Sequence, residues 1–131
     1  MAESKIEQFL IDLMYTYQQV EQNLWLIDDE DHSLNGVAIA HTDALVSFRV
    51  VVMDDSRNNA HELHARLLEL NADLIHGAYA LAGGKVLLVD TLEYDTMDYG
   101  DFRAVLDAFG VALAQHYPVL SQFRQTGRSG K

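Results

Sequence analysis

Cysteine is absent from the 131-residue chain, which excludes disulfide bonds, thiolate metal sites and a cysteine nucleophile. Proline occurs once, whereas 49% of the residues are hydrophobic and 22% are charged. This balance is typical of a compact globular protein. A chain of this length buries enough surface for one ordinary core, so we expect a single domain over residues 1–123.

Basic residues are scarce. Lys and Arg number 9 against 20 Asp and Glu, and the net charge is −11. Three of the cations fall in residues 124–131, which we predict to be a basic, disordered tail. The acidic body repels phosphate backbones and anionic lipids. We therefore expect no nucleic-acid and no membrane partner.

Long apolar runs are also missing. No stretch approaches 18 consecutive apolar residues, and the chain does not begin with a basic region followed by an apolar run. The first absence argues against a membrane-spanning helix, and the second against a signal peptide. We therefore expect a cytoplasmic protein.

Apolar residues recur at three- and four-residue intervals in three segments, which is the spacing of one face of a helix. Helices are therefore predicted over residues 3–20, 59–73 and 99–116. Pro118 follows the last segment, and the residue before a proline is biased away from helical geometry. We expect the last helix to end there.

Runs rich in β-branched and aromatic residues predict strands. Thr42-Asp43 and Gly83-Gly84 are short enough to be hairpin turns. The order helix, three strands, helix, two strands, helix predicts an α+β fold with an antiparallel sheet. The predicted strands are residues 23–28, 34–41, 44–53, 78–82 and 85–94.

The predicted strand 44–53 has two different faces. One face is wholly apolar, and the other is mixed, with Arg49 as its one charge. If no helix of the same chain covers the mixed face, it is able to recruit a partner. The candidate partner-binding residues are Leu45, Arg49, Val51 and Met53.

The predicted helix 59–73 carries a leucine stripe. Its members repeat at intervals of four, three and four residues. Such a stripe either packs on the chain's own sheet or forms a two-fold seam with a second copy. The sequence leaves both alternatives open. The candidate dimer residues are Leu63, Leu67, Leu70 and Leu74.

The nearest approach to a metal motif is the pair His61 and His64. Zinc proteases place two helical histidines four residues apart, but here the spacing is three and Ala65 occupies the fourth position. We therefore predict no metal site. A small metal-binding protein or hydrolase that uses these histidines is a weaker alternative function.

Two other motifs are incomplete. Gly83-Gly84-Lys85 has Tyr79 and Val86 where a phosphate-binding loop needs Gly and Ser or Thr. The segment 31–36 matches the first half of a calcium loop, but Thr42 stands where the bidentate Glu belongs. No arrangement of carboxylates, histidines or serines forces a catalytic site. We therefore expect no catalytic residues, no cofactor and no enzyme activity.

The second half of the chain combines short sequence runs and predicted elements in a characteristic order. They are the run Leu67–Asn71, a small hairpin at Gly83-Gly84, the run Val86–Leu88, an acidic stretch and a final helix. This arrangement resembles the Tir/CesT-type chaperones of type III secretion, and equally the related YbjN-like proteins. The resemblance covers about residues 5–120.

The resemblance implies an α+β domain that forms a homodimer and has no catalytic residues. It also implies that secretion-class members bind an extended segment of an effector protein, by strand addition or in an apolar groove. We therefore expect a non-enzymatic protein-binding module with a chaperone-like fold. A YbjN-like regulatory protein without an export client is the alternative.

Overall fold

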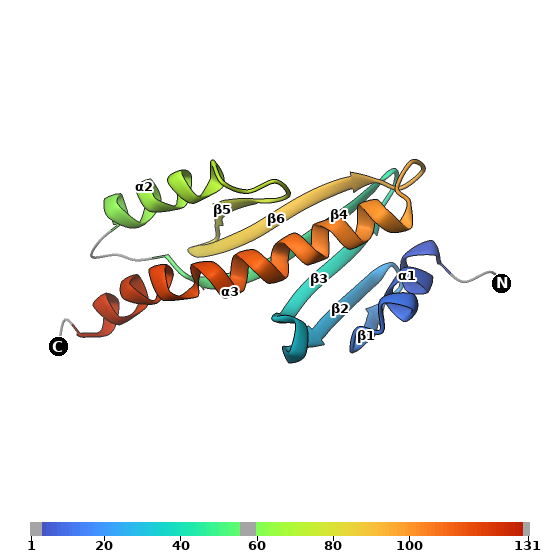
Figure 1. The fold of residues 1–131 in the computed structure, drawn as a ribbon, viewed down its shortest axis with the longest axis horizontal. Helices are drawn as coiled ribbons and strands as arrows, with labels where there is room; N and C mark the ends of the chain where they lie inside the picture. Colours follow the sequence, from blue (N-terminus) through green and yellow to red (C-terminus); the bar gives the residue numbers. More distant parts are fainter. Residues whose placement is uncertain (1–3, 56–59, 130–131) are drawn as a thin grey trace.

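The helices cover one side of a single curved sheet (Figure 1). The computed structural model describes residues 4–55 and 60–129, with side chains as far as residue 123. The observed architecture confirms the predicted α+β class. In chain order, the elements of the described part are α1 (Lys5–Leu13), β1 (Tyr17–Glu21), β2 (Leu24–Asp29), the 3₁₀ turn η1 (Glu30–His32), β3 (Leu34–Thr42), β4 (Leu45–Asp54), α2 (Ala60–Asn71), β5 (Ala78–Ala82), β6 (Lys85–Glu93) and α3 (Tyr99–Ser129).

The six strands form one sheet in the order β1-β2-β3-β4-β6-β5, and each neighbouring pair is antiparallel. Both predicted hairpins are present. Thr42 pairs with Leu45 across the first turn, and Ala82 pairs with Lys85 across Gly83-Gly84. The two glycines have φ angles of 58° and 77°, which a two-residue hairpin turn requires. The sheet therefore ends in two edge strands, β1 and β5.

The first predicted helix, residues 3–20, is wrong in its second half. Helix α1 ends at Leu13, and Met14 takes the left-handed conformation that caps a helix. The chain then enters β1, which pairs with β2. The backbone N–H of Thr16 donates to the buried Asp29 carboxylate at 2.8 Å, and this contact holds the chain at the start of the strand. The fold has one more strand than the sequence analysis predicted.

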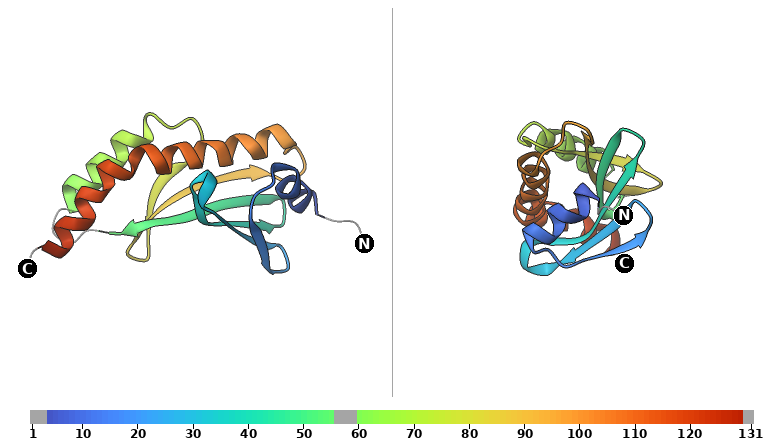
Figure 2. Two further views of the ribbon diagram at one scale, coloured as in Figure 1. Left: turned by 60° about the horizontal axis from the view of Figure 1, so that its bottom comes forward. Right: turned by 90° about the vertical axis from the view of Figure 1, so that its right-hand side faces the viewer.

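Helix α3 is longer than the sequence predicted. It runs from Tyr99 to Ser129 and contains Pro118 in its interior. Proline lacks the N–H that would bond to the carbonyl of Ala114, and α3 curves along this half (Figure 2). The helix extends into the predicted disordered tail, residues 124–131, whose side chains and last two residues lie outside the described part.

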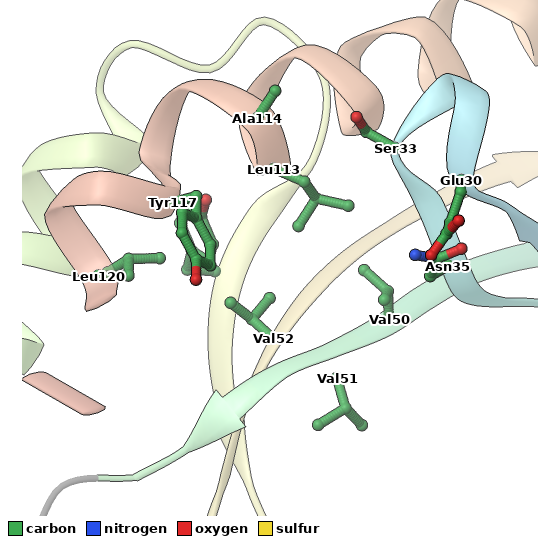
Figure 3. Close-up of a pocket in the computed structure, with 11 residues that line it drawn as sticks. Glu30, Ser33, Asn35, Val50, Val51, Val52, Leu113, Ala114, Tyr117 and Leu120 are labelled. Carbon is green, nitrogen blue, oxygen red and sulfur yellow. The ribbon is translucent and has the colours of Figure 1, made fainter. Parts of the chain in front are cut away.

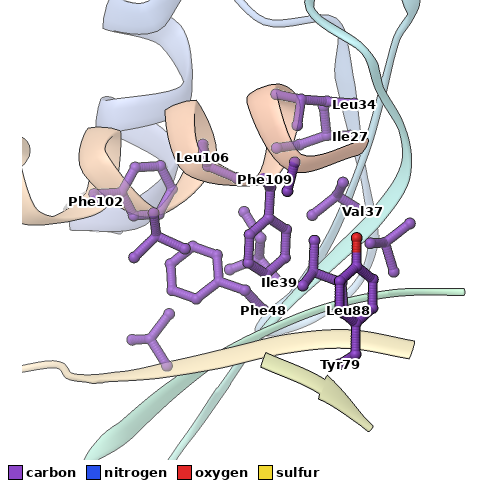
Figure 4. Packing of buried hydrophobic residues seen from close by; sticks show 14 of the residues in the cluster. Ile27, Leu34, Val37, Ile39, Phe48, Tyr79, Leu88, Phe102, Leu106 and Phe109 are labelled. Carbon is purple, nitrogen blue, oxygen red and sulfur yellow. The ribbon is translucent and has the colours of Figure 1, made fainter. Parts of the chain in front are cut away.

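The hydrophobic core lies between the sheet and the helices (Figure 4). Phe48 of β4 contacts Phe102 and Phe109 of α3, with ring centroids 5.4 and 6.4 Å apart. Helix α1 joins the same cluster through Ile6 and Leu10, and all five side chains are completely buried. Burial of a side chain of this size stabilises a fold by about 1.5–3 kcal/mol. These contacts hold α1 and α3 on the same side of the sheet.

None of the described helices is both long and apolar enough to cross a membrane.

Candidate protein-binding surface

The side of the sheet opposite the core carries no described helix (Figure 2). In β4, Leu45 and Val51 lie on this side and are 48% and 56% exposed. Arg49 lies between them and is also exposed. The sequence left open whether a helix of the same chain covers this mixed face. In the described part of the chain, the face is uncovered.

We call this uncovered side the open face and define it by the register of the strands. Residues that pair directly across neighbouring strands point to the same side of a sheet, so Ala38 and Val89 flank Arg49 on the open face. Arg49 is the charged residue at the middle of this set, and Glu21, Asp54, Lys85 and Glu93 are charged residues at the strand ends. Most of the other members are apolar, small or hydroxylated, and Leu87 is only 6% exposed. The open face consists of Gln18, Glu21, Leu24, Leu26, Ala38, Ala40, Thr42, Leu45, Ser47, Arg49, Val51, Asp54, Ala78, Ala80, Ala82, Lys85, Leu87, Val89, Thr91 and Glu93.

Met53 does not join the other predicted partner-binding residues. The register between β4 and β6 shifts between Val51 and Met53, so the alternation of sides is broken at a β-bulge. Met53 is 6% exposed and belongs to the core, and Val52 is half-buried. Because simple alternation ignores the extra residue of a bulge, the sequence placed Met53 on the wrong side.

The predicted dimer leucines lie mainly inside the chain's own core. Leu63, Leu67 and Leu70 are 0%, 4% and 6% exposed, and Leu74 packs partly buried against the same cluster. They attach α2 to its own sheet, which is one of the two alternatives that the sequence left open. The first three present no surface to a second copy.

A second apolar stripe, which the sequence analysis did not identify, lies on the other side of α2. Ala65 and Leu68 are exposed on the helix, and Ala72 and Ile75 are exposed just after it. Leu68 is 70% and Ile75 is 90% exposed. The backbone N–H of Ala72 bonds to the carbonyl of Glu69 at 3.1 Å, so the chain keeps winding beyond the helix. We call these four apolar residues the outer stripe of α2; their three- and four-residue spacing is visible in the sequence.

The two histidines of α2 do not form a ligand set. The ring of His64 is hydrogen-bonded to Asp55, with Nε2 2.8 Å from Oδ1, whereas His61 is exposed. Within residues 4–55 and 60–123, no group of three His, Asp or Glu side chains is placed to hold a metal ion. The metal-binding alternative therefore has no such ligand group in this part of the chain.

A hydrogen-bonded pair, the buried Tyr79 and the half-buried His116, links β5 to α3. The hydroxyl of Tyr79 lies 2.7 Å from Nδ1 of His116. Burial raises the pKa of Tyr79 to about 12, so the phenol stays protonated at neutral pH. Burial also lowers the pKa of His116 below its ordinary 6.5, with Asp73 opposing this shift and Arg66 adding to it. The folded protein therefore favours the neutral imidazole.

Lowering the pH from above 6.5 is expected to reduce the free energy of unfolding, because the folded protein resists protonation of His116. The unfolded chain takes up the proton near pH 6.5, whereas the folded chain takes it up only at a lower pH. The contribution of His116 to stability is therefore lost as the pH falls from above 6.5 through the lowered folded pKa. Urea unfolding of the wild type and of His116→Asn over this range measures the effect. Parallel curves of unfolding free energy against pH would contradict it.

The α+β architecture, together with the two matches that follow, supports a chaperone-like protein-binding fold. The chain matches the CesT_Tir_1 family over residues 2–126, nearly its whole length, and it belongs to that family. No curated protein matches the sequence.

A solved structure with the same fold is that of YbjN from E. coli, described as a candidate transcription regulator. The two chains share 17% sequence identity and superpose with a TM-score of 0.61, over 86% of this chain and 89% of YbjN. At this identity the likeness concerns the fold.

Proposed function

We propose that the protein is a non-enzymatic binding module that holds an extended segment of a partner protein against its sheet. The observation that carries this proposal is the open face, where Leu45, Arg49 and Val51 are exposed and no described helix packs. Membership of a family with a chaperone-like fold supports it. Apolar side chains gathered on one face favour association with another protein.

The edge strands suit an extended partner. In β1 four of the five residues are exposed, and β1 pairs with a strand on one side only. An edge of this kind presents backbone N–H and C=O groups to an added strand, whose alternate side chains supply specificity. A partner that is already folded has most of its own backbone groups paired, so it would form few hydrogen bonds with this edge strand.

The net charge of the chain restricts the net charge that a partner segment can carry. The net charge of −11 repels acidic proteins and attracts basic ones over distances up to the Debye length, about 8 Å at physiological salt. We infer that the partner segment is neutral or basic overall, with few acidic residues.

A regulatory role is the second candidate, and the likeness to YbjN favours it. The net negative charge opposes direct contact with DNA. A regulator of this kind would therefore act by binding another protein through the same open face. The two candidates share the surface and differ in whether the partner is exported.

The proposal includes a homodimer that forms through the outer stripe of α2. Exposed apolar side chains such as Leu68 and Ile75 are an ordinary feature of interfaces between subunits. A two-fold axis beside α2 would place the stripes of the two subunits against each other, so that each subunit buries its own stripe. The open face would remain accessible in both subunits.

The variant Val51→Asp is expected to abolish capture of the partner. It places a carboxylate in the middle of the open face without disturbing the core, because Val51 is 56% exposed. The matched control is Val111→Asp, at a position on α3 that is 54% exposed and lies off the open face. Tagged proteins are recovered from the native lysate, and native mass spectrometry reports a partner at defined stoichiometry. Equal capture by both variants would contradict the proposed site.

A further inference from the structure

The sheet opens between β3 and β4. Pairing between these strands covers only Ala38–Thr42 and Leu45–Arg49. Beyond this point Leu34–Val37 of β3 pairs with β2, and Val50–Asp54 of β4 pairs with β6, but the two segments do not pair with each other. Figure 1 shows the strands diverging. We call this opening the β3–β4 split.

A β-bulge stands on each side of the split. In β3, Gly36 is the extra residue in the pairing with β2, and its φ of 79° suits a glycine in a bulge. In β4, the pairing with β6 shifts register between Val51 and Met53. Because bulges bend a strand and interrupt its pairing, the split is built into the backbone of both strands.

A cavity of about 420 Å³ lies under α3 at the split (Figure 3). Ligand pockets in proteins span roughly 300–1,000 Å³. Val50 and Val52 of β4 point toward this cavity; Val51 also lines it, and its side chain lies on the open-face side of the strand. The α3 side is formed by Leu113, Ala114, Tyr117 and Leu120.

The far end of the cavity is polar and acidic. Glu30, Ser33 and Asn35 line it, and Asp28 and Asp31 line a neighbouring hollow that shares Glu30 and Asn35. None of the ion pairs in the described part of the chain involves Glu30, Asp28 or Asp31. Three carboxylates without such a pair favour a cation at this end.

We propose that the β3–β4 split takes up a basic, extended segment of the partner protein as an additional strand. Alternate side chains of a strand point to opposite sides. One set of apolar side chains therefore enters the cavity between Val50 and Leu113, the other set reaches the open face, and a Lys or Arg of the segment contacts Glu30. This inference rests on the proposed function and names the place and the chemistry of the contact.

The basic and edge segments of a second copy do not suit the split. Neither of its edge strands, Tyr17–Glu21 and Ala78–Ala82, contains a Lys or Arg to meet the acidic end. Its basic residues from 124 onward continue helix α3 as far as Ser129, whereas the occupant is extended. We therefore assign the split to a segment of another protein.

The test uses a defined probe, the fluorescently labelled and capped peptide Lys-Val-Thr-Val-Thr-Val-Lys, with binding to the full chain measured by fluorescence anisotropy. Ala114→Trp fills the cavity from an exposed position of α3 and is expected to weaken binding at least about tenfold. The control is Gln115→Trp, at the next exposed position, which does not line the cavity. It should bind within a factor of about two of the wild type.

Two control peptides test the chemistry of the occupant. One has Glu in place of both Lys residues, and the other has alternate backbone amides N-methylated so that it cannot pair as a strand. Both are expected to bind more weakly than the parent peptide. Hydrogen exchange should show protection at residues 34–37 and 50–54 when the parent peptide is bound. Protection confined to β1 or β5, equal binding by the two Trp variants, or no binding to the wild type would overturn the inference.

Partner capture from the native lysate separates this inference from the proposed function. Loss of the partner in both Val51→Asp and Ala114→Trp supports both. Loss in Val51→Asp with full retention in Ala114→Trp overturns the role of the split and leaves the open face as the binding site. Retention in both variants overturns the proposed function itself.

Discussion

Gly110→Ala is expected to lower the free energy of unfolding by about 1–3 kcal/mol, the ordinary cost of forcing an extra methyl into a packed interface. A Cβ atom at this position of α3 would lie 2.8 Å from the carbonyl oxygen of His32 in η1. Alanine in an exposed helix would instead stabilise the fold by roughly 1 kcal/mol relative to glycine. The sign of the change therefore reports whether η1 is held firmly against α3.

The surroundings of His32 indicate that η1 cannot move away easily. The carboxylate of Asp29 accepts the backbone N–H of His32 at 3.3 Å and lies 2.9 Å from its Nδ1. The same carboxylate accepts the N–H of Thr16. A shift of η1 would strain these partly buried hydrogen bonds, which are worth about 0.5–1.5 kcal/mol each and more where an ionised group takes part.

Gly100→Ala in the same helix is the matched control. Its Cβ would meet only the side-chain oxygen of Asp98, at 3.4 Å, so the helix propensity of alanine should dominate and raise stability by up to about 1 kcal/mol. Urea unfolding of the two variants gives the comparison. Stabilisation by both changes would show that η1 yields and does not fix the position of α3.

The sequence predicted most helices and strands because their periodicities are unambiguous. β4 shows strict alternation up to Val50, and α2 shows the leucine stripe. At Tyr17 and Val20 the apolar spacing fits a continued helix equally well. The contact that favours a strand here is the hydrogen bond from Thr16 to Asp29, thirteen residues away in the sequence. Local periodicity carries no information about a contact at this separation.

Pro118 shows a second limit of local reasoning. A proline inside a helix costs about 3 kcal/mol or more when nothing offsets it. In α3 the helix continues because Leu120, two residues later, is 2% exposed and belongs to the core. Tertiary burial thus outweighs a local preference that is strong in the sequence alone.

The binding surfaces were predictable in outline. Leu45, Arg49 and Val51 lie where alternation placed them, and Met53 does not, because a bulge is a property of two paired strands. The β3–β4 split arises in the same way, from extra residues in two different pairings. Neither bulge has a signature within its own strand beyond the single glycine at position 36.

Leu68→Asp is expected to convert the proposed dimer into monomers. In a two-fold interface the substitution occurs twice, and burial of one leucine contributes roughly 1.5–3 kcal/mol. The loss over two copies is therefore about 3–6 kcal/mol, or a 10²- to 10⁴-fold higher dissociation constant. Because Leu68 is 70% exposed within one chain, the fold itself should be preserved. Sedimentation velocity over a range of concentrations measures the dissociation constant directly.

Two controls make this last prediction specific to the outer stripe of α2. Val111→Asp adds the same charge at a similarly exposed position on α3 and should leave the dimer intact. Leu68→Lys distinguishes burial from repulsion between two acidic chains with a net charge of −11 each. If loss of apolar contact is the cause, Lys dissociates the dimer as Asp does. If repulsion were the cause, Lys would strengthen it. A dimer that survives both substitutions at Leu68 would place the subunit contact elsewhere on the surface.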